Sequence, residues 1–185
     1  WGRNDKGQLG SESGVARGST PESMGQALSP VQLGRNSTPE QITCGSRHTC
    51  ALLSDATIKC WGYNQLGQLG LGVQTRTVGN RPDSMGDNLP AVMLGADRRP
   101  SMVIAGNLHT CALLDDGGIV CWGSNSDGGL GSGIGGIRGK SPDDMGDNLE
   151  VVRLPGDVRA TRLALGYEMT CALAETHKVY CWGRN

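Results

Sequence analysis

Short apolar runs, bounded by glycine and other turn-forming residues, follow one another along most of the chain and predict strands. Three sets of these runs recur at intervals of about sixty residues, at 41–45, 102–106 and 162–166, at 48–53, 109–114 and 169–174, and at 58–62, 119–123 and 179–183. A fourth set follows a long polar, glycine-rich connection, at 28–33, 89–94 and 149–154. No window has the period and length of an amphipathic helix. The pattern predicts an all-β chain with four short antiparallel strands in each unit.

The same unit is marked by a recurring block, which reads WGRNDKGQLG from Trp1, WGYNQLGQLG from Trp61, WGSNSDGGLG from Trp122 and WGRN from Trp182. These tryptophans are 60, 61 and 60 residues apart. A period of this length with four strands per unit predicts β-propeller-type blades, and we expect the four tryptophans to form the blade cores. The predicted organisation is a partial repeat at 1–40 that supplies a fourth strand, blades at 41–100 and 101–160, and a partial blade at 161–185.

Six of the seven cysteines recur in pairs, Cys50 with Cys60, Cys111 with Cys121 and Cys171 with Cys181. If the second and third strands of each unit form a hairpin, the two cysteines are directly opposed and close enough for a disulfide. In the second unit the connection is then 115–117, which ends in the glycine that a left-handed turn position favours. We predict three hairpin disulfides, with buried reduced thiols as the alternative. Zinc is not expected, because no second pair stands at ligand spacing. Disulfides at this density indicate an extracellular or otherwise oxidising location.

The seventh cysteine, Cys44, stands where the other units have Ala105 and Leu165. We therefore expect an unpaired thiol that is buried as a small apolar side chain. An intermolecular disulfide or a reactive nucleophile is the alternative, but no unique base lies nearby in the sequence.

The histidines are interpreted as structural residues. His48 and His109 occupy matching positions, and the third unit has Met169 there, which argues against metal binding. We expect each of these histidines to form a hydrogen bond within its own blade. His177 is expected in a solvated hairpin loop.

Two polar segments offer further chemistry. The loops 83–88 and 143–148 carry Asp87 and Asp147, and oxygen-rich loops of this kind can bind calcium. Their spacing matches no known ligand loop and the first copy has Gln26 instead of aspartate, so we expect locally capped turns. The triplet at 36–38 makes Asn36 a candidate N-glycosylation site if the chain is extracellular.

Composition and charge limit the classes of function. The formal net charge is −1 with scattered charges, so no basic stripe indicates nucleic acid. No apolar stretch approaches the ~20 residues that span a bilayer. With 30 glycines and no phenylalanine, the core is expected to be assembled from many short segments. No cofactor-binding motif is present, and none is expected.

The segment AGNLHTCALLDDGGIVCWGSNSDGGLG and its counterparts resemble the repeat of the regulator of chromosome condensation family. The resemblance covers all three units, because the Gly, His-Thr, Ala-Leu, Asp-Gly, Trp-Gly, Asn and Gly-Gln-Leu-Gly positions recur together. It implies a propeller, usually of seven four-stranded blades. Family members include a nucleotide exchange factor for a small GTPase, ubiquitin-ligase domains and a secreted bacterial enzyme inhibitor, so the resemblance implies a fold and leaves the function open. The paired cysteines and the PDSMGDNL-type insertion resemble secreted or surface variants.

The leading functional hypothesis is a non-catalytic extracellular module that binds copies of itself, neighbouring repeats of a longer chain, or protein or glycan ligands. Most polar residues are repeated, whereas an active site normally uses unique ones, so no catalytic residues are expected. Two alternatives stay open, a fragment of a closed propeller acting as an exchange-factor-like regulatory domain, and a polysaccharide-cleaving enzyme.

The chain has no initiator methionine and stops four residues into a repeat block, so we expect an excerpt or a processed piece of a longer protein. Three units are too few for an ordinary closed ring, and a lone fourth strand leaves unpaired edges. We therefore predict an open fragment or array in which residues 1–34 complete the third blade of a preceding copy, head to tail.

Overall fold

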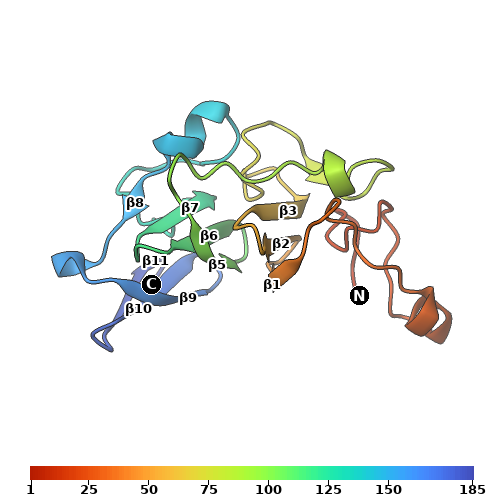
Figure 1. Cartoon of the computed structure of the whole chain (residues 1–185), viewed down its shortest axis with the longest axis horizontal. Helices are drawn as coiled ribbons and strands as arrows, with labels where there is room; N and C mark the ends of the chain where they lie inside the picture. Colours follow the sequence, from red (N-terminus) through yellow and green to blue (C-terminus); the bar gives the residue numbers. More distant parts are fainter.

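The computed structural model describes all 185 residues. Three antiparallel sheets stand side by side as blades of an arc, with the two termini towards opposite sides (Figure 1). Blade 1 contains β1 (Pro39–Cys44), β2 (His48–Leu53), β3 (Ile58–Tyr63) and β4 (Thr77–Val78). Blade 2 contains β5 (Pro100–Ala105), β6 (His109–Leu114), β7 (Ile119–Gly123) and β8 (Val151–Val152). Blade 3 contains β9 (Ala160–Leu165), β10 (Met169–Ala174) and β11 (Val179–Gly183). The predicted all-β architecture is confirmed.

The hairpin between the second and third strands has the predicted register in every blade. In blade 2, Leu114 N donates to Gly118 O, so residues 115–117 form the connection. The third residue of the connection is left-handed throughout: φ is +83° at Gly117, +63° at Ala56 and +62° at His177. Two of the three blades therefore place a side chain where only glycine fits without strain.

All three predicted disulfides are present, joining Cys50 to Cys60, Cys111 to Cys121 and Cys171 to Cys181. Each of the first two bridges lies on the side of its blade that faces the next blade along the chain. The first pair is buried in one cluster with Val103 and Trp122 of blade 2. The second pair is buried with residues of blade 3. In the third pair, Cys181 is exposed.

The predicted fourth strands are largely wrong. Only Val151–Val152 is a strand within 149–154, and neither 28–33 nor 89–94 forms one. The segment 89–94 does lie beside β3, where Val92 N donates to Ile58 O at 2.8 Å. The fourth strand of blade 1 is β4, which falls in the polar, glycine-rich connection before the predicted fourth strand. Two separate segments reach the outer edge of a blade, with 3-10 turns between them. Each segment pairs with the outer strand over only one or two residues.

Residues 1–36 pack against blade 1 without joining its sheet, and Leu33 is buried there with Ala51, Leu53 and Trp61. Two 3-10 turns, η1 (Pro21–Ser23) and η2 (Gly25–Ala27), project from this segment at the right of Figure 1. The remaining helices are η3 (Gly86–Asn88), η4 (Pro142–Asp144), η5 (Gly146–Asn148) and η6 (Pro155–Asp157). None of these helices is long or apolar enough to cross a bilayer.

Two expectations about burial are corrected in the first repeat. Trp61 and Trp122 are 2% and 0% exposed, whereas Trp1, also expected in a blade core, is 81% exposed, because no other part of the chain covers its indole. Trp182 is half-buried. Cys44 is unpaired as expected but exposed rather than buried. Its counterpart Ala105 faces blade 1, and Cys44 faces the side of blade 1 that no blade covers.

The left-handed loop position generates a stability prediction. Replacing Ala56 by glycine removes the strain of a positive φ, partly offset by the greater freedom of the unfolded chain, so the free energy of unfolding should rise by ~0.5 kcal/mol. The matched control is Gly117→Ala, which should lower it by ~1 kcal/mol or more. Urea denaturation measures both changes. A destabilised A56G variant would contradict the conformational account of this loop.

Candidate functional site: blade junctions and end faces

Each junction between successive repeats is built around one backbone carbonyl that accepts two hydrogen bonds. At the first junction, Gln8 O accepts from Trp61 Nε1 at 3.1 Å and from Thr49 Oγ1 at 2.8 Å. The acceptor belongs to one repeat and both donors belong to the next, so the bonds tie the repeats together. The same two bonds recur at Gln68 O, from Trp122 (3.0 Å) and Thr110 (2.8 Å), and at Gly129 O, from Trp182 (3.1 Å) and Thr170 (2.8 Å).

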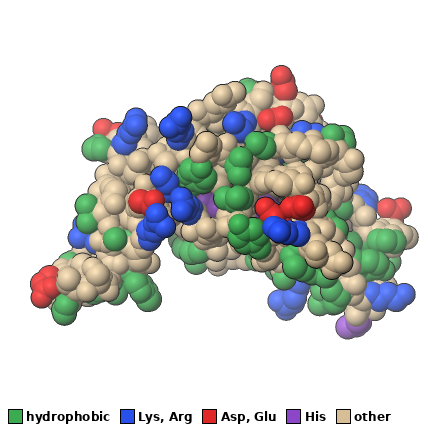
Figure 2. Space-filling model, turned by 180° about the vertical axis from the view of Figure 1, so that it is seen from behind, with side chains coloured by type: hydrophobic (Ala, Val, Ile, Leu, Met, Phe, Trp, Pro, Cys, Tyr) green, Lys and Arg blue, Asp and Glu red, His purple; other side chains and the backbone are tan.

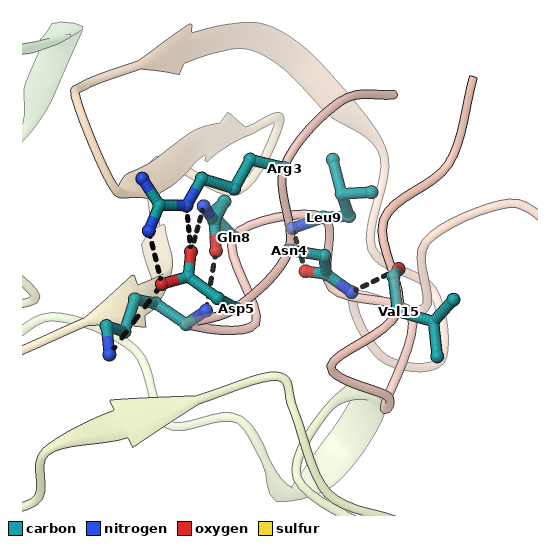
Figure 3. A network of polar contacts seen from close by, with 7 residues as sticks. Arg3, Asn4, Asp5, Gln8, Leu9 and Val15 are labelled. Atoms are coloured by element: carbon teal, nitrogen blue, oxygen red, sulfur yellow. Dashed lines mark hydrogen bonds and ion pairs between the residues drawn. The ribbon is translucent and has the colours of Figure 1, made fainter. Parts of the chain in front are cut away.

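A buried asparagine holds the loop that presents this carbonyl. Asn4 Oδ1 accepts from Leu9 N at 2.9 Å, while its Nδ2 donates to Val15 O at 3.2 Å (Figure 3). Asn64 and Asn125 accept in the same way from Leu69 N and Leu130 N, both at 3.0 Å. The Arg3–Asp5 ion pair beside Asn4 in Figure 3 is exposed, and such pairs contribute little. The repeated Trp-Gly-x-Asn block is therefore a junction-forming element.

The matching histidines bond between blades, and not within their own blade as the sequence suggested. His48 Nε2 lies 2.9 Å from Thr110 Oγ1, and His109 Nε2 lies 3.1 Å from Thr170 Oγ1. The Thr110 hydroxyl donates its hydrogen to Gln68 O, so its oxygen accepts from the Nε2–H of His48. Burial lowers the pKa of His48 from 6.5 to about 3, with a smaller repulsion from His109, and burial lowers the pKa of His109 to about 4.

The PDSMGDN-type insertion packs over the outer side of the first two junctions. A side-chain carbon placed on Gly10 would lie 2.9 Å from Trp61 Nε1 and 3.0 Å from Met85 Cε, so this glycine makes room for both groups. Gly70, Trp122 and Met145 repeat the arrangement in the next unit. The two aspartates that suggested calcium instead accept backbone N–H groups of the linker before the first strand of a blade, Asp87 from Arg35 N at 2.7 Å and Asp147 from Ala96 N at 2.8 Å.

One positively charged side chain lies beneath each of these two insertions. The two side chains come from different positions in the repeat. Lys59 of β3 donates to Leu33 O at 2.7 Å and to Gly86 O at 3.0 Å. In the next unit the position of Lys59 is taken by Val120, and Arg98 of the linker donates to Leu94 O at 2.8 Å and to Gly146 O at 3.0 Å. This cation could not be predicted from the sequence, because Lys59 and Arg98 occupy different positions in their repeats. The aspartate of each insertion, Asp87 or Asp147, was the one signal that pointed to a nearby positive charge.

The two end faces of the arc are open. On blade 1, Ile42 is 66% exposed, and Cys44 on the same strand is also exposed. Their counterparts in blade 2, Val103 and Ala105, are buried at the junction of blades 1 and 2. On blade 3, Val179 is 65% exposed, Met169 is also exposed, and the edge of β11 has no paired strand. Both faces expose apolar side chains, and blade 3 adds the unpaired edge of β11, so these faces are the candidate interaction surfaces.

The remaining surface is mixed in charge. Acidic and basic side chains are interspersed over the face shown in Figure 2. No group of three or more His, Cys, Asp or Glu side chains is placed to hold a metal ion. Asn36 is exposed, with φ +59°, in the turn that leads into β1, and His177 is exposed in its hairpin loop.

An arc of antiparallel blades with these repeated junctions defines a β-propeller-type repeat protein. A family model described as the regulator of chromosome condensation (RCC1) repeat matches residues 1–52 and 60–113, and a second model of that description matches 40–68, 104–128 and 160–185. The chain belongs to the RCC1 repeat family.

Curated relatives include the ultraviolet-B receptor UVR8 of Arabidopsis thaliana, 26% identical over all of this chain and 48% of the relative. The protein RCC2 homolog of Xenopus laevis is 33% identical over 69% of this chain and 23% of the relative. Among solved structures, human WBSCR16 superposes with a TM-score of 0.71 at 19% identity, covering 98% of this chain and 41% of that one. Yeast RCC1 (Prp20), solved bound to Kap60, gives 0.64 at 20% identity over 99% and 38%. The chain spans about half or less of the length of these relatives.

The buried histidines generate a pH prediction. Their folded pKa values lie below the ordinary 6.5, so the unfolded chain binds more protons at mildly acidic pH. The two histidines make their full contribution to the free energy of unfolding above pH ~6.5. Below that pH the free energy of unfolding falls by ~1.4 kcal/mol per pH unit for each histidine, until the pH nears the folded pKa. The control is the His48→Met/His109→Met variant, which copies Met169 of the third unit. Urea midpoints between pH 4.5 and 7.5 should show a steeper loss in the parent chain, and equal slopes would contradict the assignment.

Proposed function

We propose that this chain is a non-catalytic protein-binding module of an extracellular or cell-surface environment. The observation that carries the proposal is the disulfide at the same place in three successive blades. Cytosolic thiols are kept reduced, and disulfides repeated in this way are typical of oxidising compartments. The first two bridges fill the blade junctions, so the oxidised state is built into the packing.

Protein binding is supported by the open end faces and by the solved neighbours. Prp20p from Saccharomyces cerevisiae has binding properties towards Gsp1p and histones, and yeast RCC1 (Prp20) has been solved bound to Kap60. In this chain the exposed Ile42 and Val179 mark the two faces on which a partner would bury apolar area. A head-to-tail contact between the two end faces would generate a fibre or array unless its rotation closes the assembly into a ring. A glycan at Asn36 is compatible with its exposure.

The second candidate function is a regulatory, exchange-factor-like domain within a larger closed propeller. It is favoured by the alignment of this chain with 41% of the WBSCR16 chain and 38% of the yeast RCC1 chain. It differs from the first candidate in compartment, because a cytosolic or nuclear domain would hold its cysteines reduced.

The redox state tests the choice between the two. Alkylation of the denatured, unreduced protein purified from a secretory host should modify one thiol, Cys44, and prior reduction should expose the other six. Each bridge closes a short loop, so a Cys111→Ser/Cys121→Ser variant should lose ~2–3 kcal/mol of unfolding free energy. Cys44→Ser is the control and should be neutral. Seven reactive thiols without reduction, or a stability that reduction leaves unchanged, would refute the extracellular assignment.

A further inference from the structure

The turn that leads into β1 carries the one Asn-x-Ser/Thr triplet of the chain, at Asn36, Ser37 and Thr38. Triplets of this kind accept N-linked glycans in secreted proteins when the middle residue is not proline. Asn36 and Thr38 are both exposed. The side-chain hydrogen bond of this turn joins Arg35 N to Asp87 at 2.7 Å and leaves the Asn36 amide without a partner in the chain. The amide nitrogen is therefore free to carry a substituent.

The fold accounts for an asparagine at this position but not for the threonine that follows it. Asn36 has φ +59°, and the corresponding residues of the next two repeats, Asp97 and Asp157, have φ +58° and +52°. Asparagine and aspartate tolerate this left-handed conformation better than most residues do. The other two repeats have arginine in the place of Thr38, so the turn does not require a hydroxyl there. The triplet is therefore a feature of the first repeat that the turn alone does not explain.

The position also stays open to solvent where packed blades flank it. Blade 2 lies between blades 1 and 3 (Figure 1). Its residue at this position, Asp97, is exposed, as is Asn36. The turn lies beside the loop between β2 and β3, where Ser54 N donates to Thr38 O at 2.9 Å. A bulky group on Asn36 is therefore compatible with neighbouring blades on both sides, and it would cover the loops at this end of blade 1.

We propose that Asn36 carries an N-linked glycan, transferred from a lipid-linked oligosaccharide diphosphate. In the transfer, Asn36 Nδ2 forms a bond to the anomeric carbon of the first sugar and loses one proton. The bond from that carbon to the diphosphate oxygen breaks, and the lipid diphosphate leaves with the electron pair. Thr38 supplies the hydroxyl that the transferring enzyme recognises. The site rests on the proposed function, because this transfer takes place in the secretory pathway, and it leaves the other surfaces of the chain for partners.

Pro39, directly after the triplet, sets the expected extent of the modification. Proline restricts the preceding residue to extended backbone, which limits how Thr38 can be presented to the transferring enzyme. We therefore expect a mixture of glycosylated and bare chains. Blade 3 has Ala160 in the corresponding place, also at the start of its first strand, so a Pro39→Ala variant should fold as the parent chain does and raise the glycosylated fraction.

The test measures the intact mass of the chain secreted from a eukaryotic host, before and after treatment with peptide N-glycosidase. The glycosylated fraction should lose the mass of the glycan and end with aspartate at position 36, because the enzyme releases the side-chain nitrogen with the sugar. Asn36→Asp, which copies Asp97, should carry no glycan and keep the left-handed turn. Thr38→Arg, which copies Arg99, should lose the glycan although Asn36 is intact. Both variants should keep the urea midpoint of the parent chain.

The proposal is overturned if the secreted parent chain loses no mass on treatment, even where Pro39→Ala does. It is also overturned if Thr38→Arg stays glycosylated, since the glycan is then attached elsewhere. The thiol count of the same secreted sample separates the two proposals. One free thiol on a bare chain removes only the glycan, whereas seven reactive thiols refute the extracellular module.

Discussion

The structure depends on one carbonyl per repeat that accepts both an indole N–H and a threonine hydroxyl from the following repeat. At Gln8, Gln68 and Gly129 the acceptor is a backbone atom, so the side chain at that position is free to vary. The asparagine four residues earlier fixes the loop, and the histidine of one blade bonds the threonine of the next. An unmade bond here would leave a buried polar group without a partner, which costs ~1–3 kcal/mol. The junction therefore orders the repeats one after another.

The cysteine bridges and small residues take the place of large aromatics at these junctions. The chain has no phenylalanine, and its buried area between blades comes from disulfides, short aliphatic side chains and one tryptophan per repeat. Glycines at 10 and 70 allow a methionine of the insertion to reach the indole. The insertion, which looks like a loop in the sequence, is thus part of the core.

The three inner strands and the disulfide register could be predicted from the sequence because they depend on local patterns. Short apolar runs and the symmetric spacing of Cys111 and Cys121 define the hairpin without reference to other blades. The fourth strand could not be predicted in this way, because the chain reaches the outer edge twice and pairs only briefly each time. The exposure of Trp1 and Cys44 could not be predicted for a related reason, since it depends on whether a neighbouring repeat covers them. His48 bonds across a junction that no single repeat reveals.

The central claim is that successive repeats are held through the shared carbonyl, and exchange of the indole N–H groups tests it most directly. In protein labelled with ¹⁵N-tryptophan, the Nε1–H groups of Trp61 and Trp122 should exchange with solvent slowly, that of Trp182 faster, and that of Trp1 at nearly the rate of free indole. Equal exchange at all four tryptophans, or protection of Trp1 in the dilute chain, would contradict this account of the junctions.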